Sequence, residues 1–152
     1  MATQLKLKIV DNSRLRYEID NLLEKVNQKT ASKWSIVLAK HILEMIGEDY
    51  RLSEDLIFGF KLTELWQLDQ AKVFDVRRES LKVHTMARES ESELKRLALR
   101  VVGHSLASCH CKEHAIIASD YYIKVIGLLT SNDTTAITYE RGWQLNELRK
   151  LL

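Results

Sequence analysis

The chain of 152 residues contains no proline and only five glycines. Proline breaks helices and glycine weakens them, so both are common in chains that turn often. Their scarcity argues against a fold built from many short strands and tight turns. It favours long helices joined by short connections, and we therefore predict an all-α protein.

Cysteine is also scarce, and long apolar runs and an export signal are absent. Cys109 and Cys111 are separated by a single residue, so they cannot close a useful disulfide loop. No run of about 18 apolar residues could cross a membrane. The N-terminal sequence lacks the continuous apolar segment and the small-residue cleavage site of a signal peptide. We expect a cytoplasmic protein with no membrane partner.

Neither sign of charge dominates, because 23 basic residues are balanced by 21 acidic ones and the net charge is +2. Nucleic-acid-binding proteins usually concentrate positive charge on one face, and the sequence shows no such concentration. Glycine-rich phosphate and dinucleotide loops, the zinc-protease motif H-E-x-x-H and paired carboxylates are absent too. We predict no nucleic-acid partner and no cofactor, and we favour a protein that is not an enzyme.

What the chain does contain is a series of apolar residues at helical spacing. They predict helices over residues 15–26, 31–48, 53–69, 72–89, 92–108 and 112–130, followed by a short helix that holds Trp143, Leu145 and Leu148. Helices five (92–108) and six (112–130) are apolar on nearly all sides, which is typical of central helices. We predict one domain over residues 1–152, a single compact bundle of six to seven helices with helices five and six central. Only Leu5, Leu7 and Ile9 alternate with polar residues, as in a strand, and we expect residues 1–12 to form an extended arm or a lead-in to the first helix.

The most unusual stretch runs from Gly103 to Ala115, at the junction of helices five and six. It holds three of the five histidines and both cysteines. A zinc site is one interpretation, since zinc binds four nitrogen or sulfur ligands and this stretch offers Cys109, Cys111, His104 and His114. Structural zinc sites usually place about two to four residues between cysteines, whereas one residue separates these. We therefore predict no metal and keep this quartet as an alternative.

A second interpretation of the same stretch is a pocket or interface. His104, His110 and His114 could approach one another, with Tyr122 and Lys124 nearby on helix six. Imidazoles and the free N–H groups at a helix start suit an anion or a carboxylate of a partner protein. The competing interpretation is structural, with histidines that cap helix ends and satisfy buried carbonyl groups.

The same residues carry a resemblance to a known family. Ala98 to His104, then His110, His114-Ala115 and Tyr122-Ile123-Lys124, resemble the Imm5-like immunity family of bacterial polymorphic-toxin loci. Its members similarly carry a Gly-His pair, a junctional histidine, a His-Ala pair and a Tyr-x-x-Lys-like helix. Further segments match in the same order: Trp34 to Glu48, Trp66, residues 86–89 and Trp143-Gln144. Residues 110–114 depart from the pattern, because they lack its proline and carry cysteines that do not belong to it.

The resemblance implies an all-helical bacterial immunity protein that binds and neutralises a cognate toxin domain without catalysis. In such a protein Arg78, Arg88 and Lys124 would meet an acidic toxin surface. Lys124 also follows Asp120 by four residues, and we expect these two side chains to pair with each other. The alternative is a small-ligand or anion-binding protein, or a hydrolytic one, that uses the histidines at the junction. The candidate binding residues are His104, His110, His114, Tyr122, Lys124, Arg78 and Arg88.

Overall fold

The computed structural model describes residues 3–152, and over this range the chain forms helices and no strand. The elements in chain order are α1 (Ser13–Lys25), α2 (Gln28–Met45), a short 3-10 helix η1 (Tyr50–Leu52), α3 (Glu54–Gln67), α4 (Val73–Glu89), α5 (Glu93–Ala107), α6 (His114–Thr130) and α7 (Thr134–Arg149). Five of the α-helices begin after a side chain that accepts a hydrogen bond from the first turn, namely Asn12, Asn27, Ser53, Ser92 and Asp133. The predicted all-α fold class is confirmed.

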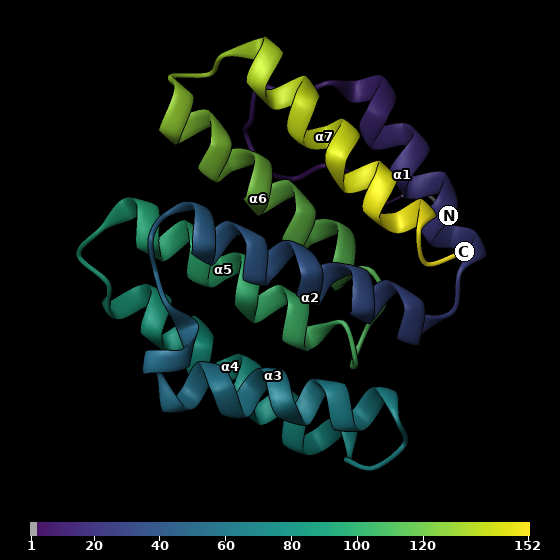
Figure 1. Cartoon of the computed structure of the whole chain (residues 1–152), viewed down its shortest axis with the longest axis vertical. Coiled ribbons are helices and arrows are strands. Elements are labelled where there is room, and N and C mark those ends of the chain that lie inside the picture. Colours follow the sequence, from purple (N-terminus) through teal and green to yellow (C-terminus); the bar gives the residue numbers. More distant parts are fainter. Residues whose placement is uncertain (1–2) are drawn as a thin grey trace.

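Helices α5 and α6 occupy the middle of the bundle, with α2 beside them, α3 and α4 at one end, and α1 and α7 at the other (Figure 1). α5 packs against α2, α3, α4 and α6, while α6 packs against α1, α2, α5 and α7. The core between them includes Trp34, Leu38, Leu106 and Ile123, all fully buried. The central position predicted for helices five and six is therefore confirmed. In residues 3–152, every helix is too short or too polar to cross a bilayer.

The last helix is longer than predicted. α7 has 16 residues and begins well before the apolar cluster around Trp143. Its buried face includes Glu140, Arg141 and Gln144 together with Ile137. Because polar side chains occupy positions that face the core, the apolar periodicity that predicts a helix is interrupted over its first half.

A buried group of two arginines and two aspartates joins three of the helices to the N-terminal segment. Arg141 on α7, which is 0% exposed, donates to Asp11 and to Asp120 on α6, each at 2.8 Å. Arg16 on α1 donates to both carboxylate oxygens of Asp120 at 2.9 Å. The predicted ion pair between Asp120 and Lys124 is wrong, because Asp120 faces these buried guanidiniums whereas Lys124 lies in a surface groove. We call Asp11, Arg16, Asp120 and Arg141 the arginine–aspartate network.

Residues 3–12 precede α1 without helix or strand and form an N-terminal arm. Its first described residue is anchored twice: the Thr3 N–H donates to Asp20 at 2.9 Å, and the Thr3 carbonyl accepts from Arg16 at 3.0 Å. From there the arm, drawn in purple, passes behind α6 and α7 to the start of α1 (Figure 1). The first two residues of the predicted 1–12 arm lie outside the described residues.

Candidate functional site

Two of the predicted histidines touch each other. His104 lies in the last turn of α5 and His114 is the first residue of α6, so the short connection between these helices brings them together. Their Nδ1 atoms are 2.9 Å apart, and the ring centroids are 5.1 Å apart. His110 lies in the connection and is exposed, with its ring centroid 6.5 Å from that of His114. His104 and His114 thus form the centre of the site, and His110 lies at its edge.

A further histidine, His84 on α4, joins His104 and His114. The spacing of histidines in the sequence does not reveal it. Its ring meets the ring of His104 edge-on, with centroids 4.8 Å apart. Arg100 donates from Nη1 to Nδ1 of His84 at 2.7 Å, and Tyr121 stacks on His104 with centroids 5.2 Å apart. We call His84, His104 and His114, with Arg100 and Tyr121, the histidine cluster. Only the packing of α4 against α5 brings His84 here, so no local motif could have indicated it.

Gly103 makes the approach of His84 possible. A Cβ atom at this position would lie 2.6, 2.7 and 2.9 Å from three atoms of the His84 ring. Such separations are shorter than any ordinary contact, so only glycine lets the ring lie against the backbone of α5. Gly103 therefore leaves space for the imidazole of His84, and the adjacent His104 supplies the imidazole that packs against it.

Replacing Gly103 with alanine is expected to destabilise the protein by about 1–3 kcal/mol, because the His84 ring must move and its hydrogen bond from Arg100 is strained or lost. Urea unfolding near neutral pH measures the change in free energy. Gly142→Ala is the matched control, since nothing beyond its chain neighbours and its own helix backbone lies within 4 Å of a Cβ there. That substitution in α7 is expected to stabilise the fold by about 0.5–1 kcal/mol. Equal effects of the two substitutions would show that Gly103 does not set the position of His84.

The histidines of the cluster are uncharged near neutral pH. Burial, aided by the nearby Arg100 guanidinium, lowers the pKa of His84 from 6.5 to about 4. Burial, followed by the neighbouring His84 and His114, lowers the pKa of His104 to about 3. The pKa of His114 is lowered by burial and then by His110. Because a guanidinium can only donate, Nδ1 of His84 must be an unprotonated acceptor. The positive charge of the cluster therefore resides on Arg100 rather than on the imidazoles.

A cavity of about 380 Å³ lies beside the histidine cluster, between the N-terminal arm and α6. Its lining includes His104, Tyr121, Glu113 and Asp120. Asp120 is already bound by the two arginines of the arginine–aspartate network, so its carboxylate is not free to act as a base. His104 is a neutral ring whose Nδ1 faces His114. The cavity can hold a small polar molecule, but it shows no paired acid and base.

The cysteines do not combine with the histidines into a metal site. Across residues 3–152, no three side chains of histidine, cysteine, aspartate or glutamate are placed to hold a metal ion together. The alternative zinc quartet of Cys109, Cys111, His104 and His114 is therefore not assembled. Cys109 is buried, and burial raises the pKa of its thiol to about 11, which keeps it protonated and unreactive.

The remaining predicted residues lie at other places. Tyr122 is fully buried and donates to Glu140 at 3.3 Å, away from the histidine cluster. Arg78 and Arg88 are exposed on α4, where Arg78 pairs with an aspartate one turn earlier at 3.1 Å. Arg88 is close enough to the cluster to help lower the pKa of its α4 histidine. The seven candidate residues therefore do not form one pocket.

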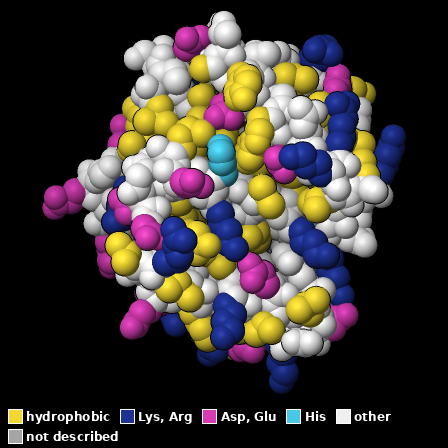
Figure 2. Space-filling model, in the orientation of Figure 1, with side chains coloured by type: hydrophobic (Ala, Val, Ile, Leu, Met, Phe, Trp, Pro, Cys, Tyr) yellow, Lys and Arg dark blue, Asp and Glu magenta, His cyan; other side chains and the backbone are white. Residues whose placement is uncertain are grey.

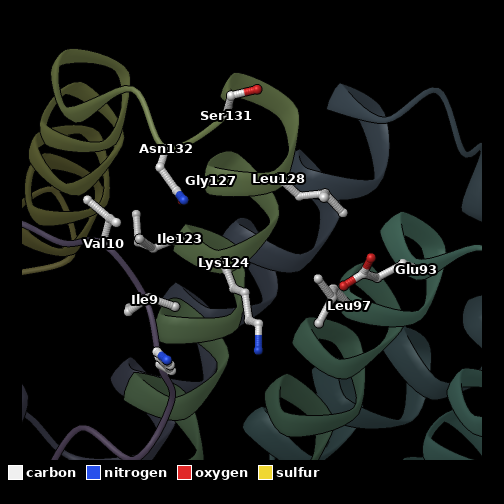
Figure 3. A pocket seen from close by; sticks show the side chains of 11 residues that line it. Ile9, Val10, Glu93, Leu97, Ile123, Lys124, Gly127, Leu128, Ser131 and Asn132 are labelled. Carbon is white, nitrogen blue, oxygen red and sulfur yellow. The ribbon is translucent and has the colours of Figure 1, made fainter.

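Lys124 projects into a groove of about 540 Å³ that lies between the N-terminal arm and α5, with α6 as its floor (Figure 3). Ile9 and Val10 line one wall, and Leu97 and Glu93 line the other (Figure 3). We call this the arm–α5 groove. The face of the molecule drawn in Figure 2 shows acidic, basic and apolar side chains intermixed, without a large patch of one kind.

No curated protein and no solved structure matches this chain. A family model described as "Imm-5 like putative immunity protein" matches residues 21–151, which is nearly the whole chain. The matched range begins within α1 and includes α2 to α7, with the Gly-His pair and its neighbouring histidines. The chain therefore belongs to the Imm-5-like immunity family.

Proposed function

We propose that this protein binds a cognate toxin domain in the bacterial cytoplasm and neutralises it without catalysis. The observation that carries the proposal is the family match over residues 21–151. An immunity protein of this kind needs no nucleophile or metal, because it acts by covering the surface that its toxin uses. The protonated thiol of Cys109 and the neutral histidines agree with this role.

The architecture suits a preorganised binder. The arginine–aspartate network holds the arm, α1, α6 and α7 together through buried, charge-assisted hydrogen bonds. A surface that is already ordered loses little conformational entropy when it binds, so more of its contact energy appears as affinity.

Growth rescue tests the proposal. The toxin-like domain encoded by the neighbouring gene is expressed alone, with this protein, or with an unrelated helical protein at the same level. We expect survival only with this protein, and a one-to-one complex on purification. Killing that continues in the presence of this protein would contradict the proposal.

The alternative is a small-ligand or anion-binding or hydrolytic role for the histidine cluster, and the adjoining 380 Å³ cavity is the observation that favours it. It predicts rescue without a stoichiometric complex. It also predicts that His104→Asn abolishes rescue while the protein stays folded. Under the binding proposal, rescue requires the complex and tolerates a substitution that leaves the contact face intact.

A further inference from the structure

The connection between α2 and α3 carries the most exposed large apolar side chain of residues 3–152. Leu52, the last residue of η1, is 86% exposed. It lies where the chain runs along the edge of the bundle (Figure 1). Single apolar residues on a surface are common and need no explanation. Leu52 differs from them because an apolar pocket lies directly beside it.

The pocket beside Leu52 has a volume of about 340 Å³, and we call it the η1 pocket. Four helices meet there, and each contributes one apolar side chain to the lining: Leu43 from α2, Leu56 from α3, Met86 from α4 and Leu99 from α5. The three leucines of these helices are buried and Met86 is half-buried. Leu52 belongs to the same lining but remains in solvent, so it leaves the pocket open.

The short helix η1 is held in the position that keeps Leu52 outside. The Tyr50 ring meets the Phe60 ring edge-on, with centroids 5.1 Å apart. Asp49 caps η1 by accepting from the N–H of Arg51 at 3.0 Å and from its Nε at 2.9 Å. A 3-10 helix turns by about 120° per residue, so side chains two positions apart point in different directions. With Tyr50 packed on the protein, Leu52 projects into solvent.

The charges around the η1 pocket do not select a charged occupant. Glu48, Asp49 and Lys95 are the charged residues of the lining. Glu48 pairs with Lys95 at 3.9 Å, and Asp49 pairs with Arg51 at 2.9 Å. Each charge at the mouth therefore has a partner of opposite sign. Because a charged group would lose water without gaining a free partner, the pocket favours an apolar group.

The surface around η1 is complementary to itself. An exposed leucine lies beside an apolar pocket that has room for one. In an isologous dimer, a two-fold axis between them would place each Leu52 in the pocket of the other copy. A surface of one charge sign would repel its own copy, whereas Asp49 and Arg51 can pair with Arg51 and Asp49 across the axis. A second copy thus supplies the apolar group that the pocket lacks.

Exposed apolar side chains continue into α3, which follows η1 directly. Ile57 is 41% exposed and Phe58 is 49% exposed, both in the first two turns of that helix. A specific contact between proteins buries about 800 Å² on each partner, which is more than one pocket provides. These two side chains add apolar surface near Leu52 for a contact of that kind.

We propose that the face around η1 is a contact between two copies of this chain, in which Leu52 of each copy fills the η1 pocket of the other. The contact is independent of the immunity function proposed above. Its energy comes from burying two leucine side chains and the apolar surface around them.

Sedimentation velocity of the full-length protein over about a hundredfold range of concentration tests this contact. We expect the sedimentation coefficient to rise with concentration toward that of a dimer. Leu52→Ser should weaken self-association by at least about tenfold, because it removes the same apolar contact at two places. The matched control is Leu68→Ser, a leucine that is 63% exposed at the end of α3 and outside the pocket. A native protein that stays monomeric, or equal weakening by the two substitutions, would overturn the proposal.

A mixture of isotope-labelled and unlabelled protein tests which side chains meet. In the mixed dimer, the Leu52 methyl groups of one copy should show nuclear Overhauser contacts with the Met86 methyl group of the other. A dimer without these contacts would overturn the proposed geometry.

The toxin domain is the competing occupant of the η1 pocket, and the same variants distinguish it from a second copy. A native protein that stays monomeric, together with a Leu52→Ser variant that loses its toxin complex, would assign the pocket to the toxin and overturn the contact between copies. A dimer with the expected Leu52 contacts in the absence of any toxin complex would overturn the immunity function and support the contact.

Discussion

Replacing Asp120 with alanine is expected to destabilise the protein by about 3–5 kcal/mol. Asp120 is 2% exposed and accepts hydrogen bonds from both Arg16 and Arg141. Its removal leaves Arg16, which is buried too, without the carboxylate that it binds at 2.9 Å. A buried guanidinium that has lost its carboxylate carries a desolvation penalty, which the remaining hydrogen bond to the Thr3 carbonyl offsets only in part.

Urea unfolding of the purified variant measures this loss, with Asp75→Ala as the matched control. Asp75 pairs with Arg78 at 3.1 Å on the exposed side of α4, so its loss should cost no more than about 1 kcal/mol. Similar losses for Asp75→Ala and Asp120→Ala would mean that burial does not make the Asp120 interactions special.

The double variant Arg16→Met with Asp120→Leu tests whether the destabilisation by Asp120→Ala comes from the charge of Arg16 that is left without its carboxylate. Arg141 keeps Asp11 at 2.8 Å and its bonds from Nη1 to Ser119 and Gln144, at 3.1 and 3.0 Å. We therefore expect the double variant to be more stable than Asp120→Ala, since removing both members of a buried pair avoids the penalty of leaving one. Additive losses would contradict this account.

Lowering the pH from about 7 to about 5 is expected to remove roughly 2 kcal/mol of stability through the histidine cluster. The folded-state pKa values of His84 and His104 fall from 6.5 to about 4 and about 3. Below pH 6.5 the unfolded chain therefore binds protons that the folded protein does not, and the free energy of unfolding decreases. The contribution is complete above pH 6.5 and is lost progressively toward pH 4 and below.

Two buried acids partly offset this loss of stability as the pH falls. Burial raises the pKa of Asp20 and of Glu140, so the folded protein takes up their protons more readily than the unfolded chain does. This compensation begins where the pH falls to their raised pKa values and is complete below their ordinary values of 3.8 and 4.5. In the interval from pH 6.5 to pH 5, a comparison of the native protein with a variant that lacks one histidine therefore isolates the histidine contribution.

Unfolding free energies measured at several pH values in that interval test the prediction. His104→Asn should flatten the dependence on pH, because one depressed pKa is removed. His110→Asn, a substitution at an exposed histidine outside the core, should change the slope much less than His104→Asn does, because it acts only through its neighbour His114. Parallel slopes for the native protein and His104→Asn would show that His104 does not couple folding to protons.

The site was partly predictable. The stretch from Gly103 to Ala115 drew attention to His104 and His114, which touch because a short connection follows α5 directly. Their third companion, His84, comes from α4 and carries no local signal. Tyr122 and Lys124 are two residues apart on α6, yet one is in the core and the other in the arm–α5 groove. Helical geometry places such neighbours on different faces, and only packing decides what each face meets.

The sequence by itself determined the all-helical class and the central place of helices five and six. Both follow from local properties, the absence of proline and the apolar residues on all sides of two segments. The tertiary structure alone decided that Asp120 binds Arg16 and Arg141 rather than Lys124, and that His84 on α4 packs against His104 on α5. Spacing within one helix reports only which residues share a face, whereas pairing between distant segments depends on how their faces pack.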